Sequence, residues 1–317
     1  MAKVWVYAEV DNGKLDPTAL ELVTKARELG ECEAVALGPG ATDAAKELGN
    51  HGAEIVYASD DEVFSDFIAQ PSVEALAELI GSNAPDLILF ATNYDSRDVA
   101  GRLSGRLGAT LMSNVVGIDS IDKARTSIFG GSLDVEVSLE GSPRLVLVRP
   151  KSWAAESNGG EATVIPVETS VSDEAKKAKR VERHEEESEG PKLEEAAVVL
   201  SGGRGLGDPD NFKYLDELAG LIPEAAVGAT RAVVDAGWVP YSYQIGQTGK
   251  TVKPSVYVAV GVSGATQHIV GMKGAKRIIA INKDEEAPIF QLADLGIVGD
   301  ALKILPQLIE EVKSRKG

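Results

Sequence analysis

The chain has 317 residues, 44% of them hydrophobic and 26% charged, which predicts an ordinary folded protein of two or three domains. Its 32 Lys and Arg residues against 49 Asp and Glu give a formal net charge of −17. This excludes nucleic acid as the main partner, because phosphate backbones bind to basic surfaces. A single cysteine, Cys32, and three widely separated histidines argue against a disulfide or a transition-metal site. With no apolar run of membrane-spanning length and no secretory signal, we expect a cytoplasmic or organelle-matrix protein without stable membrane insertion.

The N-terminal part alternates between two patterns. Apolar runs typical of buried strands occupy 3–9, 33–38, 54–58 and 86–92, and segments with helical spacing lie at 17–29, 41–49, 72–81 and 95–107. Strands that alternate with helices predict βαβ units and a parallel sheet, because parallel neighbours need a crossover connection. Asp16 and Pro17 mark the start of the first helix and Gly30 its end.

From about residue 126 the helical spacing disappears. Segments 127–139 and 144–150 have strand character and flank the sequence EGSP at 140–143, which predicts a hairpin turn. Strand character continues through 162–171. We expect an antiparallel extension of the sheet, completing a first α/β domain over 1–171.

Residues 172–195 contain 15 charged residues among 24. This pattern predicts a solvated connector between domains, and a charged docking arm remains as an alternative. The remaining residues, 196–317, show strands at 196–200, 256–260 and 276–282 and helices at 211–222 and 301–313. They predict a second domain with a doubly wound parallel sheet.

Glycine-rich loops with polar side chains follow the strands of this second domain. The loop SGGRGLG (201–207) places Arg204 at the carboxyl edge of the sheet, where α/β proteins bind ligands. Glycines let a backbone approach a phosphate and arginine contacts it through two donors, although a tight turn with a surface arginine explains the same residues. The spacing is not GxGxxG, so a standard dinucleotide fingerprint is excluded.

The segment IGQTGKT (245–251) resembles a phosphate loop but fails its spacing, because Gln244 stands where glycine is required. What remains is a loop that presents Gln247 and Thr248. In GVSGATQH (261–268), Ser263 lies between two glycines at a strand-to-helix turn, a favourable place for an anion. His268 is either a structural histidine or part of that site.

Three further residues have two interpretations each. Arg231, after Thr230, is either a surface arginine or a guanidinium that stacks on an electron-rich ring. Asn282 follows a strand. Asp300 precedes the last helix, where it either caps the helix or accepts a hydrogen bond from a ribose hydroxyl.

Together, the motifs SGGRGL, GATRAVVDAGW, QIGQTGK, YVAVGVSGATQHIVGM, IAINKDEEAPIF and ADLGIVGD resemble the FAD-binding domain of the electron-transfer flavoprotein α subunit family. The resemblance covers 196–317, and the first half is similar to the family's N-terminal domain with weaker motifs. Asn282 and Asp300 match positions on the adenosine side of FAD. The family's FAD contacts correspond to Arg204, Thr230, Arg231, Ile245, Gly246, Gln247, Thr248, Ser263, Gly264, Ala265, Thr266, Gln267, His268, Asn282, Asp300 and Ala301.

The resemblance also implies roles. Arg204 is expected beside the phosphates or ribityl chain, Arg231 against the isoalloxazine ring, the Thr248 hydroxyl near N5, and His268 near the C2 carbonyl. Arg231 and His268 would then favour negative charge on the ring, which tunes its potential. Thr230 stands where serine is frequent.

For the whole protein, the resemblance implies an electron carrier and not an enzyme that turns over a small substrate. It implies an αβ heterodimer with FAD in this chain and AMP in the β subunit. Electrons would pass from flavin dehydrogenases, such as the acyl-CoA dehydrogenases of fatty acid β-oxidation, to a membrane quinone oxidoreductase. An adenine-nucleotide-binding regulatory module and a flavin-dependent dehydrogenase are the alternatives.

Overall fold

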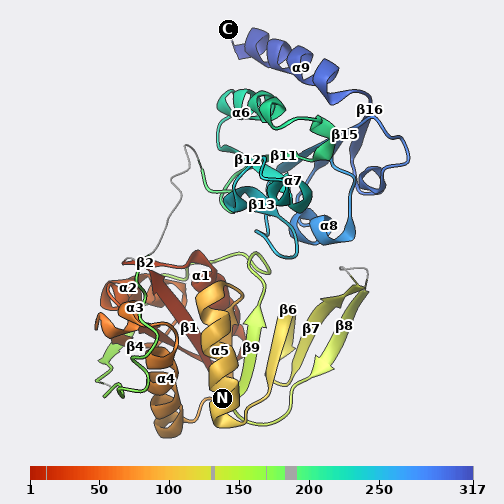
Figure 1. Cartoon of the computed structure of the whole chain (residues 1–317). Coiled ribbons are helices and arrows are strands. Elements are labelled where there is room, and N and C mark those ends of the chain that lie inside the picture. The colour runs from red at the N-terminus through yellow and green to blue at the C-terminus, as the bar shows by residue number, and fades with distance from the viewer. Residues whose placement is uncertain (12, 130–132, 169, 183–190, 317) are drawn as a thin grey trace. The chain divides into compact units, whose positions relative to one another are not determined.

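A computed structural model describes the chain except for residues 12, 130–132, 169, 183–190 and 317. It forms two compact units, Met1–Arg183 and His184–Gly317 (Figure 1). The division falls inside the charged segment 172–195. Part of that segment lies outside the described residues, so its role as a connector and the domain bounds 1–171 and 196–317 stay predictions. The described beginning of the segment contacts the first unit, since Ser172 donates to Glu74 and Arg180 pairs with Asp95.

The first unit contains a sheet in the order β10-β4-β3-β1-β5-β9-β6-β7-β8. Its parallel part consists of β10 (Thr163–Pro166), β4 (Ile55–Ser59), β3 (Glu31–Leu37), β1 (Lys3–Asp11), β5 (Leu87–Ala91) and β9 (Arg144–Val148). The strand β6 (Leu111–Ser120) runs parallel to β9, and β7 (Lys123–Ile128) and β8 (Leu133–Ser138) then add antiparallel. A short β2 (Lys14–Leu15) pairs with β1. The predicted antiparallel extension is therefore confirmed.

The predicted hairpin across 140–143 is wrong. β8 pairs with β7, whereas β9 leaves the extension and inserts between β5 and β6 in the parallel part. The physical reason lies in burial: Leu145, Val146 and Val148 are completely buried, and a strand buried on both faces belongs in the sheet interior. The strands that pair with β9 are distant from it in sequence, so the turn residues at 140–143 did not indicate its true partners.

Helices cover both faces of the parallel part (Figure 1). α1 (Pro17–Leu29) and α2 (Ala41–His51) pack on one face, and α4 (Gln70–Asn83) and α5 (Tyr94–Leu107) on the other, with the short α3 (Val63–Asp66) before α4. Alternate residues of β1 serve the two cores: Val4 and Val6 face the first, Trp5 and Tyr7 the second.

The second unit has a fully parallel sheet in the order β13-β12-β11-β14-β15-β16. Its strands are β11 (Val198–Gly202), β12 (Ala225–Thr230), β13 (Gln244–Ile245), β14 (Val256–Val260), β15 (Ile278–Asn282) and β16 (Leu295–Val298). The helices α6 (Lys213–Gly220), α7 (Arg231–Asp235) and α9 (Ala301–Lys316) share one core, and α8 (Thr266–Met272) packs in the other. The predicted two-domain α/β fold is confirmed. Among the described helices, none is long and apolar enough to cross a membrane.

Candidate functional site

The predicted site residues of the second unit lie at the carboxyl end of a strand, in the loop after it or at the start of the helix that follows. Arg204 follows β11, Thr230 ends β12, Ser263 follows β14, Asn282 ends β15 and Asp300 follows β16. The segment 245–248 begins at the end of β13. Because all six strands are parallel, their carboxyl ends meet at one edge of the sheet. The fold therefore places these residues on a common edge, as the sequence predicts.

Glycines bring the loops after β11 and β14 into direct backbone contact. The Gly205 amide donates to the Gly261 carbonyl over 2.9 Å. A Cβ on Gly203 would lie 2.4 Å from the Gly261 oxygen, and one on Gly261 would lie 2.7 Å from the Gly205 carbonyl carbon. Gly261 also has φ +63°, a conformation that side chains disfavour. Only glycine fits these positions, and the result is a stretch of bare peptide backbone beside Arg204 and Ser263.

Polar side chains around this backbone are exposed and unengaged. Arg204, Ser263, Thr266 and Gln267 are exposed, and within the described residues their side chains form no hydrogen bond or ion pair. A guanidinium, two hydroxyls and an amide beside a glycine cradle are the donors that a diphosphate group requires. This donor set fits an anionic dinucleotide such as FAD.

Several hydrogen bonds hold the turn after β13. The Gln247 amide donates to the Gln267 carbonyl over 2.8 Å, and the Lys250 amide donates to the Gln244 carbonyl over 2.7 Å. The Tyr241 hydroxyl donates to the Thr248 carbonyl, and Gln244 Nε2 donates to Thr248 Oγ1 over 3.0 Å. Thr248 itself is exposed, so a fixed turn presents its hydroxyl at the edge.

His268 connects α8 to this turn. It is 5% exposed, with Nδ1 3.0 Å from the Ile245 carbonyl and Nε2 2.8 Å from the Tyr257 hydroxyl. A carbonyl only accepts, so Nδ1 carries the proton and Tyr257 donates to Nε2. Burial lowers the pKa of His268 to about 4. Both ring nitrogens are bonded within the chain, and the expected contact of His268 with the C2 carbonyl and its contribution of charge at the ring stay predictions.

Arg231 has a partner that the sequence reasoning missed. Its Nε donates to Asp235 Oδ2 over 3.0 Å, one helical turn later on α7, and both side chains are more than half exposed. An exposed ion pair of this kind contributes little to stability. Arg231 is therefore held at the edge by a weak contact, next to Thr230, whose side chain forms no capping bond.

Two residues predicted near adenosine make bonds within the chain. Asn282 Nδ2 donates to the Val262 carbonyl over 2.9 Å and its Oδ1 accepts from the Asp284 amide, which joins the loops after β14 and β15. Asp300 Oδ1 accepts from the Leu302 amide over 3.0 Å, so the capping interpretation of Asp300 is observed. Ala301, the first residue of α9, is buried. Contacts of these residues with a ligand stay predictions.

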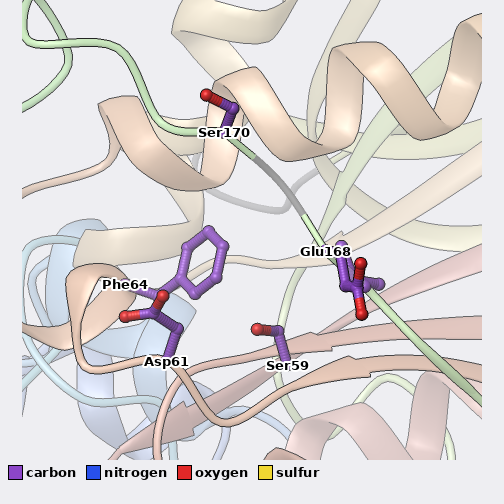
Figure 2. A pocket seen from close by; sticks show the side chains of 6 residues that line it. Ser59, Asp61, Phe64, Glu168 and Ser170 are labelled. Carbon is purple, nitrogen blue, oxygen red and sulfur yellow. The ribbon is translucent and has the colours of Figure 1, made fainter.

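A separate pocket lies in the first unit (Figure 2). It is lined by Ser59, Asp61, Phe64, Val167, Glu168 and Ser170. Two carboxylates at this pocket would repel an anionic ligand, unlike the arginine-bearing edge of the second unit. The electrostatics thus favour the second unit as the anion site.

Comparison with known proteins gives a consistent result for both units. The model of the electron transfer flavoprotein domain matches residues 4–187, and that of the electron transfer flavoprotein FAD-binding domain matches 192–273. The chain is 41% identical to the electron transfer flavoprotein subunit alpha of Mycobacterium leprae and 42% identical to that of Mycobacterium tuberculosis, covering 100% of each chain. It is 38% identical to that of Paracoccus denitrificans, covering 96% of this chain and 98% of the relative.

Proposed function

The chain belongs to the α-subunit family of electron transfer flavoproteins, and we propose that it binds FAD at the carboxyl edge of its second sheet. The observation that carries this proposal is the set of unengaged donors, led by Arg204 and Ser263, around backbone that only glycine can form. In an α/β sheet such an edge is where nucleotides bind.

The residues divide into three groups by chemistry. Arg204 and the 263–267 turn offer donors to the diphosphate. Thr230, Arg231 and Thr248 approach the ring, where the guanidinium favours negative charge. Asn282 and Asp300 lie toward the adenosine, at the ends of β15 and β16.

FAD, when bound, supplies the one-electron chemistry, and the chain positions it. The turn 245–248 would hold the Thr248 hydroxyl toward N5 through the hydrogen bond that this hydroxyl accepts from Gln244. Neutral His268 keeps that turn attached to α8 through the Ile245 carbonyl. Each of these residues has a role in holding or positioning FAD, and none is assigned to chemistry on a small-molecule substrate. We therefore propose an electron carrier and not an enzyme with substrate turnover.

The partners follow from the family. We propose a β subunit that forms a heterodimer with this chain and holds AMP. Flavin dehydrogenases, including acyl-CoA dehydrogenases of fatty acid β-oxidation, would donate electrons, and a membrane quinone oxidoreductase would accept them. A cytoplasmic or organelle-matrix location is consistent with the single buried thiol, Cys32.

Co-expression with a β-type subunit tests the function. We expect a yellow heterodimer with the absorbance spectrum of bound flavin, which bleaches in steps during reductive titration. A colourless complex that retains a second adenine nucleotide besides the AMP of the β subunit would favour the regulatory module instead. Turnover of a small substrate by the heterodimer alone would identify a flavin-dependent dehydrogenase.

A further inference from the structure

Gln244 is a buried polar residue at the base of the turn that carries Thr248. Its side chain is 2% exposed and its Nε2 lies 3.0 Å from Thr248 Oγ1. Gly249 lets the turn close on it, because a Cβ there would lie 2.3 Å from the Gln244 carbonyl oxygen and 2.9 Å from its Cγ. The amide is thus fixed in position, away from water.

The direction of this hydrogen bond determines what the hydroxyl can do next. A threonine hydroxyl has one proton and two lone pairs. The Gln244 amide donates to one lone pair, so the Thr248 proton must point elsewhere, and Thr248 is exposed in the turn that follows the carboxyl end of β13. We propose that Gln244 is a positioning residue that makes the Thr248 hydroxyl a hydrogen-bond donor toward the bound cofactor.

This inference rests on the proposed function, because it requires the flavin ring to lie beside Thr248. A donor directed at a ring nitrogen stabilises the negative charge that arrives with the first electron. Without Gln244 the hydroxyl can rotate and turn its proton away from the ring. The potential of the first one-electron step should then fall.

Tyr241 provides a matched control. Its hydroxyl also bonds to Thr248, but to the backbone carbonyl. Tyr241→Phe therefore removes a bond that holds the turn without changing the direction of the Thr248 proton. Substitution of Tyr241 therefore tests how the turn is held, whereas substitution of Gln244 tests how the Thr248 hydroxyl is oriented.

The experiment uses the FAD-loaded heterodimer and measures the midpoint potential of the first electron by spectroelectrochemical titration. We expect Thr248→Val to lower the equilibrium constant of that step about tenfold, and Gln244→Met to lower it about threefold. Tyr241→Phe should leave it unchanged. In the Thr248→Val background Gln244→Met should have no further effect, because Gln244 acts only through the hydroxyl.

Gln244→Leu also removes the amide donor and serves if Gln244→Met does not fold. It should lower the equilibrium constant of the first one-electron step about threefold as well. The proposal is overturned if both Gln244 variants have the midpoint potential of the parent protein while Thr248→Val lowers it. It is also overturned if Tyr241→Phe lowers the midpoint potential as much as Gln244→Met does. The same holds if Gln244→Met lowers the potential equally in the Thr248→Val background. A heterodimer that holds no flavin refutes the proposed function itself, a result distinct from these.

Discussion

The two sheets of this chain share the arrangement of their central strands but differ at the edge where ligands bind. In the first unit β1 lies between β3 and β5, and in the second β11 lies between β12 and β14. In both, the chain first adds strands on one side and then crosses to the other, which creates the crevice where α/β proteins place ligands.

In the first unit the chain's own side chains satisfy one another at this position. Ser96 Oγ donates to Glu9 over 2.7 Å, and Asn93 Nδ2 donates to Asp16 over 2.9 Å. In the second unit the same position holds glycine backbone and the unengaged Arg204. The comparison shows that the sheet determines where a ligand could bind. The loop residues determine whether the polar groups there bond to one another or remain available to a ligand.

The first prediction tests whether the glycine contact makes the difference. Gly261→Ala should destabilise the second unit by about 3 to 4 kcal/mol, because its Cβ meets the Gly205 backbone at a positive φ. Gly207→Ala is the control: its φ is +77° but a Cβ there meets nothing within 4 Å, so only about 1 kcal/mol is expected. Urea unfolding of the full chain measures both, and equal losses would show that the close approach does not matter.

The second prediction contrasts the buried titratable groups of the two units. The pKa of His268 is lowered from 6.5 to about 4. Between these two pH values the unfolded state therefore binds more protons than the folded state. The second unit gains stability as the pH rises through this range, by about 3 kcal/mol in total. Burial raises the pKa of Glu9 to about 7 from 4.5. There the folded state binds more protons, so the first unit loses stability as pH rises through that range.

Peptide-resolved hydrogen exchange across the acidic to neutral range reports the two units separately. His268→Gln should flatten the pH dependence of the second unit. Glu9→Gln should reduce that of the first only in part, because burial also raises the pKa of Glu21 to about 7. If both units follow the same pH trend, the assignment of opposite signs to His268 and Glu9 is wrong.

Much of the fold could be predicted because local signals agree with the tertiary structure. Asp16 accepts from the Thr18 amide and α1 starts at Pro17 and stops before Gly30, as its capping residues indicate. β14 is equally clear from its apolar run. β12 was missed, since the small residues of Ala225–Thr230 give little strand signal, and β9 was misassigned because its partners are distant in sequence.

The location of the candidate site could be predicted for a related reason. Glycine loops that follow strands identify the carboxyl edge without any knowledge of packing. Sequence alone could not show the contacts across that edge, such as Gln244 with Thr248 or Arg231 with Asp235. Gln244 was noticed only because it breaks a phosphate-loop pattern, and a polar residue in a buried strand is the signal that would have revealed it.

The third prediction concerns the unengaged arginine. Arg204→Ala should weaken FAD binding by about ten- to a hundredfold, the loss expected for a charge-assisted contact, and leave the stability of the chain unchanged. Arg277→Ala is the control, because Arg277 is an exposed arginine paired with Asp294 just before β15, at the opposite end of that strand. Fluorescence of released FAD measures both affinities. If the two variants retain FAD equally well, Arg204 does not contribute to FAD binding.

The fourth and smallest effect separates charge at the ring from stability. Arg231→Ala should lower the maximum yield of one-electron-reduced flavin in a redox titration, because a positive charge that favours the negative ring is lost. Unfolding free energy should change by less than about 0.5 kcal/mol, since the pair with Asp235 is exposed. Arg315→Ala removes a similar exposed pair, with Glu311 on α9, and should change neither quantity. An unchanged yield in Arg231→Ala would reduce Arg231 to a surface arginine and leave Thr248 as the tested polar contact with the ring.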